Sequence, residues 1–380
     1  MRPLLPLLAL LLPAAARAQE NPWKNGLPRD PAFFPVAVWL QDPRNAPRYR
    51  EAGINVYVGL WKGPSGDQLT ALKAAGMKLV CHQDETALSH PARDIIVAWM
   101  HGDEPDNAQP RAGGGYGPPI PPETIVADYG KLRAADPTRP ILLNLGQGVA
   151  WDNWIGRGVR SRHPEDYPEY AKGCDIVSFD IYPAVHDNPE VAGKLWHVPF
   201  GVERLRKWTQ DRKIVWNCIE ASRIDNTRVK PTPAQIRSEV WMSIIQGSRG
   251  LIYFVHQFKP RFIEASLLED TELLKGVSEI NRQIHELAPA LNSPTVPDGA
   301  EIKSSSADVP VAGLVKRQGK ATYVFAAAMR DGPAKATFAL KGAPAAASAE
   351  VLGEGRKIAV RSGRFEDDFK PYEVHLYRIE

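Results

Sequence analysis

The chain has 380 residues, of which 43 % are hydrophobic, 24 % charged and 8 % aromatic. This composition excludes a disordered protein, a collagen-like repeat and a disulfide-stapled miniprotein. The formal net charge is only +3, so no long-range field attracts nucleic acid or an anionic membrane surface. We therefore expect no nucleic-acid partner that is bound through its phosphate backbone.

The first 18 residues have the pattern of an export signal. A basic start, Met1-Arg2, is followed by an apolar run over Leu4–Leu12 and by the small-x-small sequence Ala16-Arg17-Ala18. This order predicts a signal peptide over 1–18 that is removed before Gln19, and a secreted or periplasmic mature protein. The run is far shorter than the roughly 20 residues of a membrane-spanning helix, and no later stretch qualifies, so no membrane insertion is expected.

From residue 33 to residue 295, short apolar runs alternate with helical stretches. The eight runs, rich in Val, Ile, Leu and aromatic residues as buried parallel strands are, are Phe34–Leu40, Ile54–Leu60, Lys78–His82, Ile95–Met100, Ile141–Leu145, Asp175–Ile181, Lys213–Ile219 and Gly250–Val255. Helix-entry residues precede three of the stretches between them, which predicts helices over Gln68–Ala75, Thr124–Ala135 and Ala234–Gln246. Eight such units in about 260 residues match the size of a (β/α)8 barrel.

An open, doubly wound sheet is the structural alternative to the barrel. That fold usually has a glycine-rich phosphate turn after its first strand. Here the first strand runs into Trp39-Leu40-Gln41-Asp42-Pro43, which favours the barrel. We assign 33–295 to a (β/α)8 TIM barrel and 19–32 to a segment that leads into it.

After about residue 296 the pattern changes to short alternating strands without a helix-length stretch. The strands are predicted at Gly313–Lys316, Ala321–Ala328, Ala336–Leu340, Glu350–Leu352, Lys357–Val360 and Tyr372–Ile379. This spacing predicts a small C-terminal all-β domain over 296–380, a β-sandwich.

Cofactor chemistry has no support in the sequence. The nine histidines are scattered, without an H-E-x-x-H motif or a Cys/His cluster at zinc spacing. A nucleophile elbow and a phosphate-binding loop are also absent. The three cysteines, Cys81, Cys174 and Cys218, cannot form a disulfide framework. We therefore predict no metal, no other cofactor, and buried free thiols.

Two carboxylates follow the fourth and seventh predicted strands. Glu104 lies in Gly102-Asp103-Glu104-Pro105, and Glu220 ends Trp216-Asn217-Cys218-Ile219-Glu220. In a barrel of this kind the active site forms at the carboxyl ends of the strands, and strands four and seven lie across the mouth from each other. Facing carboxylates are what the cleavage of a glycosidic bond requires, one to donate a proton and one to support the anomeric carbon.

This layout resembles the clan A glycoside hydrolases, retaining (β/α)8 enzymes in which the acid/base follows strand four and the nucleophile follows strand seven. The resemblance covers the barrel in layout and is carried by two short motifs, so it assigns no individual family. It implies that Glu104 is the acid/base and Glu220 the nucleophile in the cleavage of a β-linked oligo- or polysaccharide by double displacement. In the clan an Asn at this position holds the sugar 2-hydroxyl, and this chain departs from the pattern with Asp103, so the resemblance does not establish that contact here.

Several other side chains stand at strand ends and are candidates to bind the sugar. Tyr182 follows the sixth strand, where a phenol can hydrogen-bond Glu220 and keep it ionised. The remaining candidates, each beside a strand end in the sequence, are Asp103, Asp180, His256, Trp39, Trp61, Gln41 and Asn144. Trp151, beyond the fifth strand, is a further aromatic residue of this kind, and aromatic faces suit sugar rings.

Two alternatives stay open at this point. The chain is either an enzyme or a non-catalytic carbohydrate-binding protein on the same scaffold, with Asp103 a symptom of lost chemistry. Within the enzymes, an inverting or differently assigned hydrolase would use Asp180 or Asp103, and Asp180 is the alternative nucleophile to Glu220.

Overall fold

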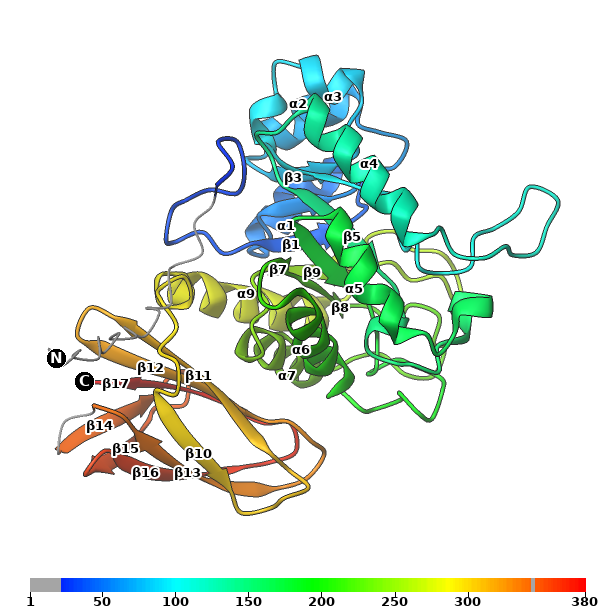
Figure 1. Cartoon of the computed structure of the whole chain (residues 1–380). Helices are drawn as coiled ribbons and strands as arrows, with labels where there is room; N and C mark the ends of the chain where they lie inside the picture. Colours follow the sequence, from blue (N-terminus) through cyan, green and yellow to red (C-terminus); the bar gives the residue numbers. More distant parts are fainter. Residues whose placement is uncertain (1–21, 343–345) are drawn as a thin grey trace, which may run out of the picture.

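The computed structural model describes residues 22–342 and 346–380, so the predicted signal peptide lies outside the described residues. A parallel β-barrel surrounded by helices comes first, and an antiparallel β domain packs against one side of it (Figure 1). This arrangement confirms the predicted fold class, a TIM barrel followed by an all-β domain.

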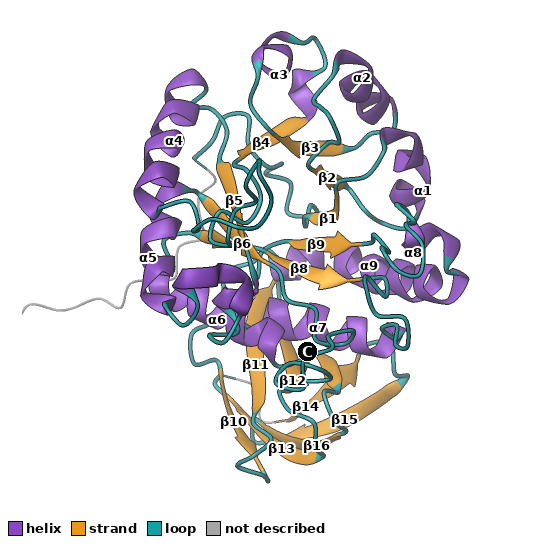
Figure 2. Cartoon of the chain, turned by 90° about the vertical axis from the view of Figure 1, so that its right-hand side faces the viewer, coloured by secondary structure: helices purple, strands orange, loops and turns teal. Residues whose placement is uncertain are grey.

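All eight predicted barrel strands are present, and the seventh is split in two. The strands are β1 (Val36–Trp39), β2 (Val56–Val58), β3 (Lys78–Cys81), β4 (Ile96–Met100), β5 (Ile141–Leu145), β6 (Ile176–Phe179), β7 (Ile214–Val215), β8 (Asn217–Glu220) and β9 (Leu251–Phe254). β7 pairs with β6 and β8 pairs with β9, both in parallel. Because only Trp216 separates β7 from β8, the sheet closes on itself (Figure 2).

Helices cover the outside of the barrel (Figure 2). They are α1 (Ala46–Glu51), α2 (Gly66–Ala74), α3 (Glu85–Ser89), α4 (Pro122–Ala135), α5 (Tyr167–Tyr170), α6 (His197–Thr209), α7 (Pro233–Ile245), α8 (Ser266–Glu269) and α9 (Thr271–Leu291). The three predicted helices correspond to α2, α4 and α7. Ser65 and Thr232 form capping boxes at the starts of α2 and α7, which satisfy backbone N–H groups that lack a partner within the helix.

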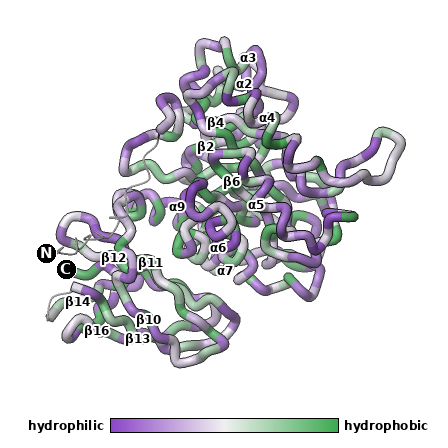
Figure 3. Tube along the Cα trace, viewed as in Figure 1, coloured by the Kyte–Doolittle hydropathy of each residue, from purple (hydrophilic) through white to green (hydrophobic). Residues whose placement is uncertain are grey.

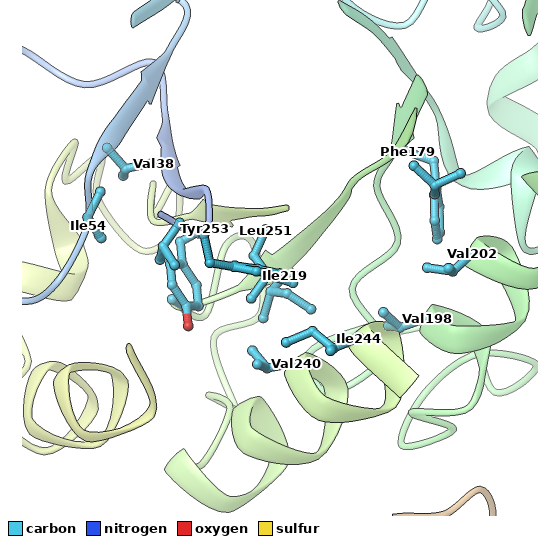
Figure 4. Close-up of a cluster of buried hydrophobic side chains, with 14 of the residues drawn as sticks. Val38, Ile54, Phe179, Val198, Val202, Ile219, Val240, Ile244, Leu251 and Tyr253 are labelled. Atoms are coloured by element: carbon cyan, nitrogen blue, oxygen red, sulfur yellow. The ribbon is translucent and has the colours of Figure 1, made fainter. Parts of the chain in front are cut away.

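Alternation along the strands divides the barrel core into two layers. Inward-facing side chains such as Trp39 and Trp216 fill the lumen, and their outward-facing neighbours pack under the helices. Figure 4 shows the outer layer, where Ile219 lies against Val240 and Ile244 of α7. Apolar segments accordingly gather in the barrel interior in Figure 3. The buried free thiols are also confirmed, since all three cysteines are buried and unpaired.

The C-terminal domain is an eight-stranded antiparallel sheet. Its strands are β10 (Ala300–Ser304), β11 (Val311–Gln318), β12 (Ala321–Ala328), β13 (Ala334–Leu340), β14 (Ala346–Val351), β15 (Arg356–Arg361), β16 (Arg364–Phe369) and β17 (Val374–Ile379). One residue pair, Arg361 with Arg364, joins β15 to β16, so the two halves of the sheet fold over a shared core. β10 and β16 are not evident from the sequence because Glu, Asp and Lys, which are rare in strands, occupy the exposed positions between their less exposed residues.

The β domain packs on α7. The ring of Trp241 lies 5.5 Å from that of Phe325 in β12, and both side chains are fully buried. Arg237 donates a hydrogen bond to the Val374 carbonyl at 3.0 Å, and Ser238 donates to the Tyr372 carbonyl at 2.7 Å. The apolar core is therefore continuous from the barrel into the β domain.

Candidate active site

A chain of hydrogen bonds crosses the barrel lumen just below its mouth. Ser178 of β6 donates through Oγ to Oδ1 of Asn144 in β5, at 2.8 Å. Asn144 donates through Nδ2 to Oδ1 of Asp103, at 2.9 Å. Ser178 and Asn144 are buried, whereas Asp103 is exposed. Both ends of the Asn144 amide are thus engaged within the protein, and its role here is to orient Asp103.

The carboxyl groups of Glu104 and Asp180 meet at this mouth. Glu104 follows β4 and Asp180 follows β6, and their side chains lie within hydrogen-bonding reach of each other. Both residues are half-buried. One oxygen of Asp180, Oδ1, is buried without a hydrogen-bond partner. The structure therefore pairs Glu104 with the carboxylate that the sequence offered as an alternative nucleophile.

The environment of this pair places a proton on Glu104. Burial raises the pKa of Glu104 well above its usual value, and the charge of Asp180, its hydrogen bond and the charge of Asp103 add to this increase. Burial also raises the pKa of Asp180, to about 7, but hydrogen bonds from Glu104 and Tyr182 oppose the increase. Like-charged carboxyls in contact cannot both ionise readily, so Glu104 is the protonated partner.

The backbone at Glu104 is strained. Its φ of 41° lies in the left-handed region, which costs a non-glycine residue on the order of 1–3 kcal/mol and persists only where neighbours impose it. Here the Glu104 carbonyl accepts hydrogen bonds from the Asn107 N–H and from Gln109 Nε2. Asp106, fully buried, anchors the same loop. The Glu104 side chain is thus positioned by a loop that the fold holds rigid.

Asp106 has a structural place in this loop. Its carboxylate accepts hydrogen bonds from the Gly146 N–H at 2.9 Å and from the Tyr167 hydroxyl at 3.0 Å. It therefore ties the loop after β4 to the loop after β5 and to α5, with both of its oxygens occupied.

Glu220 lies outside the Glu104–Asp180 pair. It ends β8 and is fully buried, and its Oε1 accepts a hydrogen bond from the Ala184 N–H at 2.6 Å. Its other neighbour is Glu239 of α7, also fully buried, with which it shares a hydrogen bond. No hydrogen bond joins Glu220 to Glu104 among the described residues. A carboxyl without solvent access cannot reach an anomeric carbon in this conformation, so the nucleophile assignment of Glu220 stays a prediction that the burial disfavours.

Burial governs the titration of both members of this second pair. It raises the pKa of Glu220 to about 7, against the hydrogen bonds from Glu239 and from the backbone at Ala184 and Val185. It raises the pKa of Glu239 well above the usual range, with further contributions from the charge and hydrogen bond of Glu220. Protonated Glu239 is therefore the donor to Glu220.

Tyr182 serves a different carboxylate from the one expected. Its position in the sequence predicts that the phenol can hydrogen-bond Glu220. In the structure its hydroxyl is within hydrogen-bonding reach of Asp180 instead. The ring of Tyr182 packs 5.2 Å from that of Phe254. Side chains two residues apart in a strand point to the same face. Ser178, Asp180 and Tyr182 therefore project to the same side of β6 and its extension.

Gln41 and His256 belong to one hydrogen-bond network at the ends of the first and last barrel strands. Gln41 is fully buried; its Nε2 donates to the Glu264 carbonyl, and its Oε1 accepts from Tyr49. Its Nε2 also lies 3.1 Å from Nε2 of His256. His256 is buried as well, and burial lowers its pKa. Most of their polar atoms are thus engaged within the protein, while Nδ1 of His256 has no hydrogen-bond partner among the described residues; a sugar contact for either residue stays a prediction.

The three tryptophan candidates differ in their exposure to solvent. Trp39 is buried in the lumen, and Trp151 is buried where it donates to Glu190 at 2.6 Å. Trp61 is 65 % exposed and is the one of the three that can offer a ring face to a ligand. The sequence analysis overlooked Phe258 and Phe262, both exposed, which stack on His256. Their signal was the aromatic spacing Phe254, Phe258, Phe262 after the last strand.

Within residues 22–342 and 346–380, no three His, Cys, Asp or Glu side chains are grouped so as to hold a metal ion. No helix in these ranges has the length and apolar character needed to cross a bilayer.

The fold is shared with solved glycoside hydrolases. An α-amylase from Geobacillus thermoleovorans complexed with acarbose superposes with a TM-score of 0.54 at 9 % identity, covering 93 % of this chain and 99 % of the amylase. A putative α-galactosidase from Bacteroides fragilis also superposes with a TM-score of 0.54, at 10 % identity, covering 92 % of this chain and 79 % of that one. No family model and no curated protein matches the sequence. At such low identity the likeness establishes the fold and leaves the family open.

Proposed function

We propose that the protein is a glycoside hydrolase that cleaves O-glycosidic bonds at the mouth of the barrel. The observation that carries this proposal is the Glu104–Asp180 carboxyl pair at the carboxyl ends of β4 and β6. Such a pair supplies both groups that the reaction needs, a protonated acid and an anionic partner. The resemblance of Gly102-Asp103-Glu104-Pro105 to the clan A acid/base motif supports the same role for Glu104.

In the proposed reaction, Glu104 is the general acid. Burial and the neighbouring carboxyls raise its pKa and so favour the protonated form, which can give its proton to the leaving-group oxygen as the glycosidic bond breaks. Asp180 attacks the anomeric carbon and forms a glycosyl ester. Glu104, now ionised, then takes a proton from the water that hydrolyses this ester, which restores both carboxyl groups and retains the anomeric configuration.

The spacing of the strands leaves room for a sugar between the two groups. β5 lies between β4 and β6, so their backbones are about 9.5 Å apart at a normal strand spacing. Side chains that meet across this gap can also rotate apart to the roughly 5–5.5 Å of a retaining pair. We infer that the observed contact is the ligand-free arrangement and that substrate separates the two carboxyls.

The choice between Asp180 and Glu220 is tested by substitution. Reducing-sugar release is measured on plant, algal and bacterial polysaccharides and on aryl α- and β-glycosides, since the motif resemblance implies a β-linkage. We expect E104Q and D180N to lose activity by about 100- to 10,000-fold, and E220Q to keep most of it. E239Q is the matched control, because it alters the same buried pair without replacing either candidate nucleophile.

Three other outcomes would contradict the proposed mechanism. If E220Q abolishes release while E239Q and D180N do not, Glu220 is the nucleophile and the assignment of Asp180 is wrong. Release of the inverted anomer, followed by proton NMR of the first product, would contradict the glycosyl ester. Sugar binding without turnover in the parent protein would instead establish the non-catalytic alternative.

We also propose that the protein is exported, on the basis of the leader pattern at 1–18. Expression of the full chain with N-terminal sequencing tests this proposal. A mature protein that begins at Gln19 in the medium or periplasm would support it, and retention of Met1 would contradict it.

A further inference from the structure

A hollow of about 580 Å³ lies at the opposite end of the barrel from the carboxyl pair. Its lining includes Phe34, Lys213 and Arg249, each of which stands just before a barrel strand. The other side is formed by the 291–297 segment that follows α9 and by Lys316 of β11. The hollow is therefore shared by the base of the barrel and the β domain.

Four cationic side chains line this hollow; Arg206 is paired with a carboxylate, and Lys213 has a hydrogen bond to a carbonyl but no anionic partner among the described residues. Arg206 donates through Nε to Asp211 at 2.6 Å and through a second nitrogen to the Gln246 carbonyl at 2.8 Å. Lys213 donates to the Cys174 carbonyl. Asp211, the one carboxylate among the lining residues, is thus already engaged with Arg206.

The other two cations, Arg249 and Lys316, have no anionic partner among the described residues. Neither takes part in an ion pair there, and the guanidinium of Arg249 donates no hydrogen bond to a described residue. Lys316 is only 4 % exposed and has a single hydrogen bond, to the Ser293 carbonyl at 2.8 Å. Lys316 is thus a buried cation without a counterion in the described part of the chain, whereas buried charges in proteins are normally paired. Arg249 beside it is half-buried and also unpaired there.

The two cations also act on each other. Burial and the neighbouring charge of Arg249 together lower the pKa of Lys316 to about 8, and burial lowers the pKa of Arg249. An anion between them would relieve both the desolvation and the repulsion. Arginine offers a planar fork that matches an oxyanion and lysine adds a point charge, a combination that suits a compact anion with two negative charges.

We propose that this hollow is a binding site for a small dianionic oxyanion, phosphate or sulfate, held between Arg249 of the barrel and Lys316 of the β domain. Because its two ligands come from different domains, the bound anion links the barrel base to the β domain. The site is independent of the proposed glycosidase chemistry, which takes place at the other end of the barrel.

The test is thermal unfolding of the full chain titrated with sodium phosphate and, separately, sodium sulfate, at an ionic strength held constant with sodium chloride. We expect a saturable rise in melting temperature, and calorimetric titration should show one anion per chain. R249Q and K316M should each weaken the binding at least tenfold. K303M, which removes an exposed lysine of β10, should bind like the parent protein.

The variants are checked so that misfolding cannot imitate loss of binding. Far-UV circular dichroism must match the parent, and R249K, which keeps the charge without the fork, should bind more weakly than the parent but better than R249Q. Titration with glucuronate separates a free inorganic oxyanion from the carboxylate of a sugar. Equal shifts with phosphate and chloride, unchanged binding in R249Q and K316M, or binding of glucuronate without phosphate would each overturn the proposal.

Discussion

Replacing Glu220 with glutamine should make the stability of the protein much less dependent on pH. Burial against α7 raises the pKa of this carboxyl from 4.5 in the unfolded chain to about 7. Between these values the folded chain holds a proton that the unfolded chain has lost, so the free energy of unfolding falls as the pH rises. At 1.36 kcal/mol for each pH unit, the fall contributed by Glu220 is about 3 kcal/mol.

Glutamine removes the titrating group but can keep the hydrogen bonds of Glu220. Its amide oxygen can still accept from the Ala184 N–H, and its amide nitrogen can donate to Glu239. The assay is urea unfolding of the parent and E220Q at pH 5 and pH 8. We expect the stability difference between the two proteins to shift by about 2.5 kcal/mol in favour of E220Q from pH 5 to pH 8, because this interval covers most of the range between the two pKa values.

The same measurement can refute the reasoning. A stability difference that stays constant between pH 5 and pH 8 would mean that Glu220 titrates as a solvated carboxyl. Glu220 would then have access to the cleft, and the nucleophile assignment from the sequence motif would regain its support. In E239Q the free energy of unfolding should also fall less steeply as the pH rises, because the substitution removes the other carboxyl of the buried pair.

Three further predictions concern stability measured by urea unfolding. D106A should cost about 2–5 kcal/mol, because it leaves the Gly146 N–H and the Tyr167 hydroxyl without their acceptor; a loss below 1 kcal/mol would contradict its anchoring role. W241A should cost about 3–5 kcal/mol through the cavity left against Phe325, whereas W241F should cost less, because the indole N–H is buried without a partner. In anion-free buffer the parent should gain up to about 3 kcal/mol between pH 8 and 10.5, where folded Lys316 has lost a proton that the unfolded chain still holds. K316M should lack this gain, and an equal gain in K316M would show that Lys316 is not its source.

The fold could be predicted because its signals are local. Each barrel strand is a continuous apolar run, as expected for strands that are buried on both faces, and the capped starts of α2 and α7 follow from Ser65 and Thr232 with their partners Gln68 and Gln235. The strands that escaped prediction carry charges on one face. In β16 the charged run Glu366-Asp367-Asp368 hides the pattern of a strand whose Phe365 and Phe369 are buried.

The site was predicted only in part, because strand-end position does not determine the direction of a side chain. The sequence placed Glu104, Asp180 and Glu220 at the ends of three strands, and the structure agrees with all three placements. Whether two such carboxyls face each other depends on the closure of the barrel and on what covers each strand end. Glu220 instead shares a hydrogen bond with Glu239 of α7. Glu239 lies nineteen residues further along the chain, and no sequence motif predicts this contact.

The sequence by itself determined the barrel, the all-β domain and the set of carboxylates available at the barrel mouth, because strand periodicity and helix caps are encoded within a few neighbouring residues. Only the tertiary structure decided that Glu104 meets Asp180, that Glu220 is sealed against α7, and that Arg249 shares a hollow with Lys316. These pairings join residues that are far apart in the chain, and packing distances and the loss of water around each charge govern them.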